Sequence, residues 1–153
     1  MEPFFQVGII VEDIEAAMSE LTRAQNVQWG KVAARKYQQW DFKRVFSLDG
    51  PPYIELIEGP PGSPWDSSQG SRIDHLQWWT RDMEADTRRM QAAGVPLDTD
   101  GVKESPMVAA DGSRKPGIFR YFRAPKSGMR LELIDESVKA NHRERWGIDG
   151  PKA

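Results

Sequence analysis

Two stretches of the chain resemble each other, and together they decide the expected fold. Residues 5–16 read FQVGIIVEDIEA, and residues 74–85 read DHLQWWTRDMEA. Aligning Gln6 with His75 sets an offset of 69 residues, at which three residues recur. These are Asp13, Glu15 and Ala16, which return as Asp82, Glu84 and Ala85. Similarity at a fixed offset is typical of an internal structural repeat. Each stretch predicts a β-strand and then a helix, because Asp is a favoured N-cap and an early Glu suits the positive helix end.

A second pair of matching segments lies further along each half. Residues 53–58 read YIELIE and residues 130–135 read RLELID, and aligning Glu55 with Glu132 gives an offset of 77 residues. The longer offset implies about eight extra residues in the second half. The stretch from Glu104 to Gly117, rich in Pro, Gly, Ser and Asp, is the natural place for them.

Each half has room for two more strands between its matching segments. Helices are predicted at about 13–25 and 82–94, and the candidate strands are Lys31 to Tyr37, Phe42 to Ser47, Ser105 to Ala109 and Gly117 to Arg123. Each half therefore reads β-α-β-β-β. The expected fold class is α+β, with two βαβββ modules forming a curved mixed sheet around a central cavity.

One domain is expected over residues 4–135. Its modules cover about 4–59 and 72–135, joined by a linker rich in Gly and Pro. Residues 136–153 form a C-terminal tail, whose end from Gly147 is expected to be loose.

The repeat also brings polar residues into an apolar setting. Gln6 and His75 occupy equivalent positions in the first strands, and Glu55 and Glu132 occupy equivalent positions in the last strands. Each Glu is flanked by aliphatic residues on both sides, where an ionised carboxylate is costly unless it is paired or binds a metal. If the modules pack with twofold pseudosymmetry, the four side chains converge. Two adjacent carboxylates then need a compensating cation, which a divalent ion supplies.

Composition excludes several other classes of protein. The formal net charge is −2 and there is no cysteine, so nucleic-acid binding, a disulfide scaffold, a thiolate zinc site and a cysteine nucleophile are not expected. No apolar stretch approaches the roughly 20 residues that cross a bilayer, and no signal peptide is readable, so we expect a cytoplasmic protein without membrane contact. The six Trp residues favour an aromatic-lined pocket or interface.

Paired β-α-β-β-β modules with these motifs resemble the vicinal-oxygen-chelate superfamily, which includes glyoxalases, bleomycin-resistance proteins and methylmalonyl-CoA epimerases. The resemblance is carried by residues 5–13, 54–59, 73–94 and 129–135. In that family the metal ligands lie on the first and last strands of each module, which here are Gln6, Glu55, His75 and Glu132. Many members have His where this chain has Gln6, whereas some glyoxalase I enzymes use Gln, Glu, His and Glu.

The resemblance implies a metal-dependent isomerase, epimerase or lyase acting on a small-molecule substrate. The cofactor would be one divalent ion, either zinc, nickel, cobalt or magnesium, which polarises a carbonyl next to the C–H bond that loses its proton. Glu132 is the expected catalytic base. Glu55 is the second catalytic carboxylate, either as a ligand or as the partner base of an epimerisation. A homodimer is expected by analogy with the family, and Trp146 in the tail could pack on the partner.

Four residues are candidates for contact with the substrate: Gln77, Trp79, Trp40 and Arg120. Gln77 and Trp79 share a strand face with His75, and Arg120 is a candidate for holding a substrate anion. Core packing explains Gln77 and Trp79 equally well, and ordinary loop burial is the better explanation for Trp40. An outward charged face would explain Arg120. The alternative function is a non-catalytic small-molecule binding protein of the bleomycin-resistance type, with aromatic walls. A ring-cleaving dioxygenase is a third reading, but its two-His-one-carboxylate iron site within one module is missing.

Overall fold

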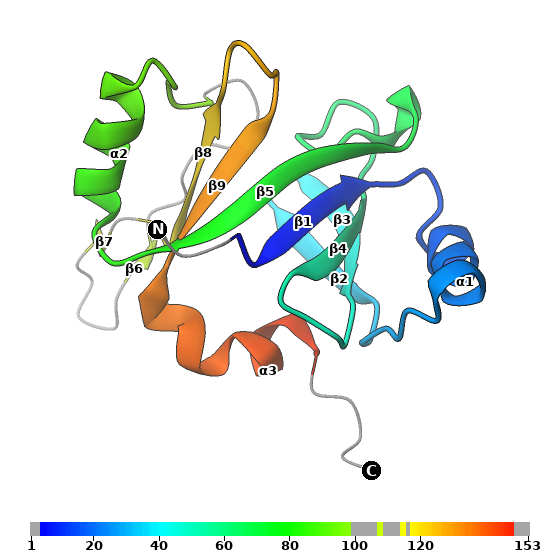
Figure 1. Ribbon diagram of the computed structural model, residues 1–153. Helices are drawn as coiled ribbons and strands as arrows, with labels where there is room; N and C mark the ends of the chain where they lie inside the picture. The colour runs from blue at the N-terminus through cyan, green and yellow to red at the C-terminus, as the bar shows by residue number, and fades with distance from the viewer. Residues whose placement is uncertain (1–3, 99–106, 109–113, 116, 149–153) are drawn as a thin grey trace.

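The central feature of the computed structural model is a seven-stranded sheet curled into a half-barrel (Figure 1). The structure describes residues 4–98, 107–108, 114–115 and 117–148. The strand order is β2-β3-β4-β1-β5-β9-β8. The strands are β1 (Gln6–Ile10), β2 (Ala33–Tyr37), β3 (Trp40–Phe46), β4 (Tyr53–Glu58), β5 (Arg72–Thr80), β8 (Phe119–Arg123) and β9 (Arg130–Asp135).

Both predicted long helices form where the capping residues place them. Asp13 caps α1 (Ile14–Gln25), and Asp82 caps α2 (Met83–Ala92), each carboxylate accepting a hydrogen bond at 2.9 Å from the backbone N–H three residues on. This bond satisfies one of the unpaired N–H groups at a helix start. Just beyond α2, Gly94 takes the left-handed conformation that commonly ends a helix, with a φ of 76°.

The two halves of the sheet repeat the same pairing, which confirms the predicted duplication. β1 pairs in parallel with β4, β5 pairs in parallel with β9, and β1 and β5 run antiparallel at the centre. The next strands outward, β3 and β8, pair antiparallel with β4 and β9. First and last strands of each module are therefore direct neighbours, and the two first strands meet in the middle of the sheet.

The second module departs from the first in its inserted segment. The predicted strand over 117–123 is β8, whereas only part of the predicted strand over 105–109 is described, as the short β6 (Met107–Val108). It pairs with β7 (Arg114–Lys115) in a separate two-stranded sheet. The remainder of the predicted insertion lies outside the described residues.

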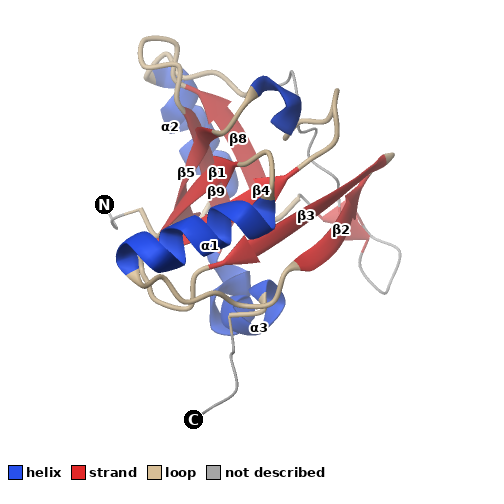
Figure 2. Cartoon of the chain, turned by 90° about the vertical axis from the view of Figure 1, so that its right-hand side faces the viewer, coloured by secondary structure: helices blue, strands red, loops and turns tan. Residues whose placement is uncertain are grey.

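The two faces of the large sheet have different partners. Helices α1 and α2 cover the outer face (Figures 1 and 2). Under α1, Ile14 packs with Val45 and Leu56, and under α2, Met90 packs with Phe122 and Leu133. The inner, concave face carries two further apolar clusters and the polar residues described below. Since strand residues alternate between faces, the helices take one set of side chains and leave the other set for the cavity.

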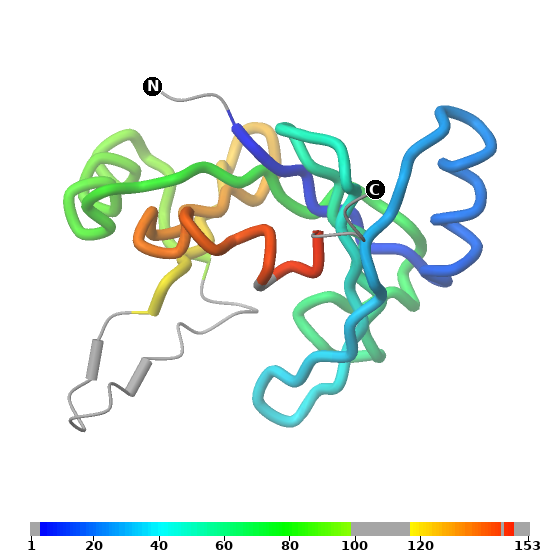
Figure 3. The backbone as a smooth tube through the Cα atoms, turned by 90° about the horizontal axis from the view of Figure 1, so that it is seen from below, coloured from blue at the N-terminus to red at the C-terminus, as the bar shows by residue number. Residues whose placement is uncertain are grey.

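The C-terminal segment packs against the sheet more tightly than the sequence predicts. It contains the 3-10 helix η2 (Glu136–Asn141) and helix α3 (His142–Trp146), and it crosses between the two halves of the molecule (Figure 3). Trp146 is stacked 5.1 Å from Phe46 and 5.8 Å from Phe5, measured between ring centroids, and Ile148 is buried. The expectation of a loose end from Gly147 is therefore wrong as far as Ile148. The Trp146 ring is buried within its own chain, which replaces the expectation that it could pack on a partner.

Candidate metal and substrate site

The four residues singled out by the repeat meet on the concave face of the sheet. The strand register explains why. Gly8 of β1 pairs with Glu55 of β4 on one side and with His75 of β5 on the other, so these three form one row across the sheet. An adjacent row is formed by Gln6 of β1, Gln77 of β5 and Glu132 of β9. The predicted duplication thus brings side chains from both first strands and both last strands together at one site.

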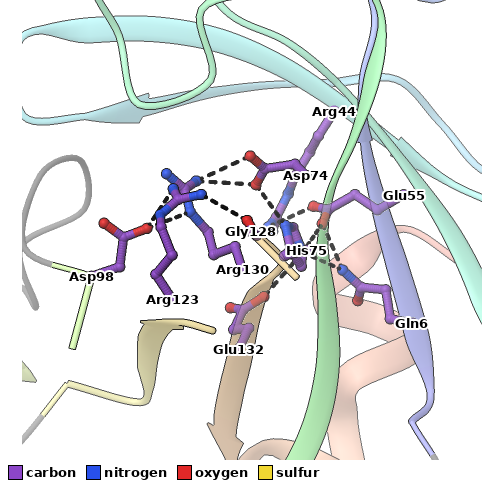
Figure 4. Close-up of polar contacts among 10 residues, drawn as sticks. All are labelled: Gln6, Arg44, Glu55, Asp74, His75, Asp98, Arg123, Gly128, Arg130 and Glu132. Atoms are coloured by element: carbon purple, nitrogen blue, oxygen red, sulfur yellow. Dashed lines mark hydrogen bonds and ion pairs between the residues drawn. The ribbon is translucent and has the colours of Figure 1, made fainter. Parts of the chain in front are cut away.

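The four side chains touch one another directly (Figure 4). His75 Nε2 lies 3.1 Å from Glu132 Oε2 and 3.4 Å from Glu55 Oε2. Gln6 Nε2 donates a hydrogen bond of 2.6 Å to Glu55 Oε2 and lies 3.4 Å from His75 Nε2. All four residues are buried. The convergence expected from the sequence is present in the structure.

Gly8 provides the space in which the His75 ring lies. A Cβ atom at this position would stand 2.1 Å from His75 Cε1 and 2.5 Å from both ring nitrogens. Real carbon–carbon contacts are about 3.5–4.0 Å, so any side chain here would displace the ring. The absence of a side chain at residue 8 allows the imidazole to cross the row toward Glu55 and Glu132.

A further carboxylate, which the sequence analysis did not find, holds the other side of the imidazole. Asp74 Oδ2 lies 2.9 Å from His75 Nδ1. Neighbouring strand residues normally face opposite ways, but the register between β1 and β5 shifts here, because Gly8 pairs with His75 and Ile9 with Ile73. Asp74 is the extra residue of this β-bulge, and bulges redirect side chains in this manner. A carboxylate at the second ring nitrogen fixes the tautomer and orientation of a metal-binding histidine.

Buried ion pairs hold Asp74 in turn. Arg130 Nη1 lies 3.1 and 3.2 Å from the two carboxylate oxygens of Asp74, and Arg130 Nε donates to Asp98 at 2.9 Å. Arg123 donates to the same oxygen of Asp98 at 2.8 Å. A chain of alternating charges therefore runs from the edge strand β8 to the imidazole of His75 (Figure 4).

Burial and neighbouring charges shift the pKa values within this cluster. Burial alone would lower the pKa of His75, but the charge of Glu132 and the contacts with Asp74 and Glu55 raise it well above its ordinary value. Burial raises the pKa of Glu132, and the nearby His75 opposes that shift. Burial would also raise the pKa of Asp74, but its bonds to His75 and Arg130 keep that pKa below the ordinary value. The carboxylates around the imidazole therefore favour its protonated form when no other cation is present.

These residues fit a divalent ion in their chemistry. As they stand, no group of three or more His, Asp and Glu side chains within the described residues meets the geometric requirements of a formed metal site. The spacings of 3.1 and 3.4 Å around His75 Nε2 nevertheless match the separation, about 3.0–3.5 Å, of ligand atoms that share one ion at bonds of about 2.0–2.2 Å. The buried Oε1 of Gln6 has no hydrogen-bond partner among the described residues. Rotation of the Gln6 carboxamide by 180° would present this oxygen to the ion.

A cavity of about 240 Å³ opens over the cluster. Gln6, Glu55 and Glu132 belong to its floor, and its apolar walls include Phe42, Trp65, Phe119 and Tyr121. The walls come from both modules and from the loop after β4. The volume is below the range of about 300–1,000 Å³ that is typical of drug-sized ligands.

The four residues predicted to contact the substrate do not all line this cavity. Gln77 lines the cavity and is buried, and its Oε1 accepts no hydrogen bond from the residues that the structure describes. Trp79 is stacked on Phe5 at 4.1 Å between ring centroids and lies outside the cavity lining.

Trp40 and Arg120 also lie away from the cavity lining. Trp40 is stacked on Tyr37 at 6.5 Å between ring centroids. Arg120 lies on the outer face of β8, where it donates hydrogen bonds to Thr87 and Glu84 of α2. The structure therefore brings only Gln77 of the four to the cavity.

Comparison with known proteins identifies the superfamily to which the chain belongs. The chain matches the family model of the Glyoxalase/Bleomycin resistance protein/Dioxygenase superfamily over residues 5–114, and it belongs to this superfamily. This confirms the family predicted from the repeat. A search of curated proteins found no match.

Solved structures with the same fold include three informative neighbours. A variant of the Streptomyces coelicolor methylmalonyl-CoA epimerase, in complex with 2-nitronate-propionyl-CoA, has a TM-score of 0.60 at 20% identity, over 88% of this chain and 94% of that chain. A hypothetical protein from Bacillus halodurans has a TM-score of 0.60 at 19% identity, over 87% and 93%. A mutant of 4-hydroxymandelate synthase from Streptomyces coelicolor has a TM-score of 0.59 at 13% identity, over 87% and 48%. At these identities the likeness shows the fold.

Proposed function

We propose that this protein is a metal-dependent isomerase or epimerase, or a lyase of the glyoxalase type, which transfers a proton at a carbon next to a carbonyl group. The observation that carries the proposal is the contact of the buried His75 with both Glu132 and Glu55, two carboxylates that line one cavity. Superfamily members commonly bind a divalent metal ion. Two structural neighbours are named as methylmalonyl-CoA epimerases, and an isomerase chemistry of this kind fits the proposal.

Four side chains would hold the metal ion: Gln6, Glu55, His75 and Glu132. When bound, a divalent ion supplies polarisation of a carbonyl oxygen and so lowers the barrier to removal of the neighbouring proton. Asp74 keeps the His75 ring turned toward the carboxylates. The apolar walls exclude water from the reacting carbon, and the buried carboxamide of Gln77 is positioned to bind a polar group of the substrate.

Glu132 is the proposed base. Its carboxylate would take the proton from the substrate carbon and return it, so that no proton is lost over the cycle. Without a bound cation, burial raises the pKa of this residue above the ordinary value, which favours proton acceptance by a carboxylate that is not bound to the ion. Glu55, on the opposite module, is either a ligand or the second base that an epimerisation requires.

A binding protein without catalysis is the second candidate function, as in the bleomycin-resistance branch of the superfamily. The observation that favours it is the aromatic lining of the cavity by Phe42, Trp65, Phe119 and Tyr121. A ligand held by stacking against these rings would need no metal ion.

Metal analysis separates these functions. We expect about one equivalent of zinc, nickel, cobalt or magnesium in protein purified without chelator, and none would support the binding protein. Incubation in deuterated water with candidate 2-oxo and thioester substrates then reports proton exchange by mass spectrometry. Glu132→Gln should abolish exchange, whereas Glu20→Gln, at an exposed position of α1, should leave it unchanged. Exchange at the full rate in folded Glu132→Gln would show that another group is the base.

The cellular setting remains a prediction. No helix within the described part of the chain has the length and apolar character needed to cross a membrane. A cytoplasmic location and a homodimer remain expectations from the sequence and from the family resemblance.

A further inference from the structure

We propose that the substrate is a small carboxylate with an apolar body, and that Arg44 binds the carboxylate group. The inference rests on the proposed function, because it counts the charge of the divalent ion. It names the chemical class of the substrate, which the fold and the metal ligands leave open.

Arg44 lies on β3 and lines the cavity beside the acidic cluster. Its Nη1 forms an ion pair with Glu55 at 3.6 Å from Oε1, which is beyond hydrogen-bond distance. Its Nε is buried without a hydrogen-bond partner, and its guanidinium lies 5.3 Å from the centre of the Phe46 ring. The aromatic wall therefore supports the cation, while its N–H donors make no hydrogen bond within the described residues.

The charges around the cavity leave Arg44 without a full counter-charge. Asp74 and Asp98 are paired with Arg130 and Arg123 in the buried chain of ion pairs. A divalent ion would offset the two negative charges of Glu55 and Glu132. The guanidinium of Arg44 then carries an uncompensated positive charge inside a cavity. A ligand with one negative charge would restore neutrality, and Arg is well suited to bind a carboxylate through two parallel hydrogen bonds.

The cavity walls near Arg44 indicate the chemical character of the remainder of the ligand. Phe42, on the same face of β3 two residues away, lies 4.4 Å from Trp65 between ring centroids. Trp65 Nε1 is buried and has no hydrogen-bond partner in the part of the chain that the structure describes, so it is a second N–H donor on a lining residue. Arg35 and Lys36 of β2 line the same cavity, and Lys36 Nζ lies 3.9 Å from Asp41 Oδ1. The cavity thus combines an aromatic wall with donors for an anion.

The test compares two ligands of nearly equal shape that differ in charge, phenylacetate and phenylacetamide. Binding is followed by the change in tryptophan fluorescence, with metal content measured on the same samples. We expect wild-type protein to bind the acid at least tenfold more tightly than the amide. Arg44→Gln should lose this preference while keeping its affinity for the amide, and Arg44→Lys should keep part of it. Arg88→Gln removes an equal charge from an exposed position on α2 and should behave as wild type.

Each other outcome is decisive. An unchanged preference in Arg44→Gln, with a wild-type thermal melting curve, overturns the assignment. A preference that survives Arg44→Gln but disappears on chelation means that the carboxylate binds the metal ion instead, which also overturns it. Absence of metal from wild-type protein with a preference that still depends on Arg44 rejects the proposed function and leaves the anion site standing. If Arg44 only neutralises Glu55, the ratio of the two affinities will not change.

Discussion

Replacing Gly8 with alanine tests whether the His75 ring must lie where the structure places it. The added Cβ would stand 2.1 Å from His75 Cε1, which is more than 1 Å inside ordinary van der Waals contact. The backbone of β1 is paired on both sides, with β4 and β5, and cannot easily move away. The imidazole must therefore shift by at least about 1 Å, away from Glu55 and Glu132.

A shift of this size should weaken the metal site more than the fold. Overpacking of one methyl group costs about 1–3 kcal/mol of folding free energy. Disturbing the orientation of a ligand histidine typically lowers metal affinity by about 10–100-fold, which corresponds to about 1.4–2.8 kcal/mol. Competition titration against a chromophoric chelator measures the affinity, and urea unfolding of the metal-free protein measures the stability.

The matched control is Val7→Ala, on the opposite face of the same strand. This change removes apolar volume without touching the His75 ring, so it should cost stability while leaving metal affinity at the wild-type value. Gly8→Ala protein that is folded and binds metal as tightly as wild type would refute the reasoning.

Three further predictions follow from the same contacts. Asp74→Asn removes the charge that orients the imidazole, and we expect about tenfold weaker metal binding in the same titration; unchanged affinity would mean that Asp74 does not position the ring. Because Glu132 and the other carboxylates raise the pKa of His75 well above its ordinary value in spite of burial, metal must displace a proton at neutral pH. Apparent affinity should then rise with pH, and calorimetry in two buffers of different ionisation enthalpy should detect the released proton; heats independent of the buffer would argue against it. Trp146→Ala should destabilise the fold by about 3–5 kcal/mol in urea unfolding, since the ring is buried between Phe46 and Phe5; a loss below about 1 kcal/mol would mean that the C-terminal segment adds little to the core.

The main features of the fold could be predicted because both polar and apolar residues recur at equivalent positions of the two halves. Aligning Gln6 with His75 and Glu55 with Glu132 identified the two modules, and the observed register places these residues in adjacent rows. Capping by Asp13 and Asp82 set the helix starts. Helix caps are local signals and the aligned residues are repeated ones, so both can be recognised without knowledge of tertiary contacts.

Asp74 was missed and Arg120 was assigned to the wrong face, and both errors come from features that strand periodicity does not reveal. Asp74 reaches His75 only because a β-bulge breaks the alternation of β5. Arg120 faces α2 because Tyr121, not Arg120, pairs with Glu132 and shares its face. The face on which Arg120 lies could have been predicted from a correct strand pairing, since cross-strand partners lie on the same side of a sheet. A small residue at position 8, facing a buried histidine, was a usable sign of a close approach.

Anomalous diffraction from crystals grown with one equivalent of zinc tests the central claim most directly. We predict a single peak at about 2.0–2.2 Å from His75 Nε2 and from a carboxylate oxygen of both Glu55 and Glu132. Peaks confined to surface residues, with His75 still in direct contact with the two carboxylates, would contradict it.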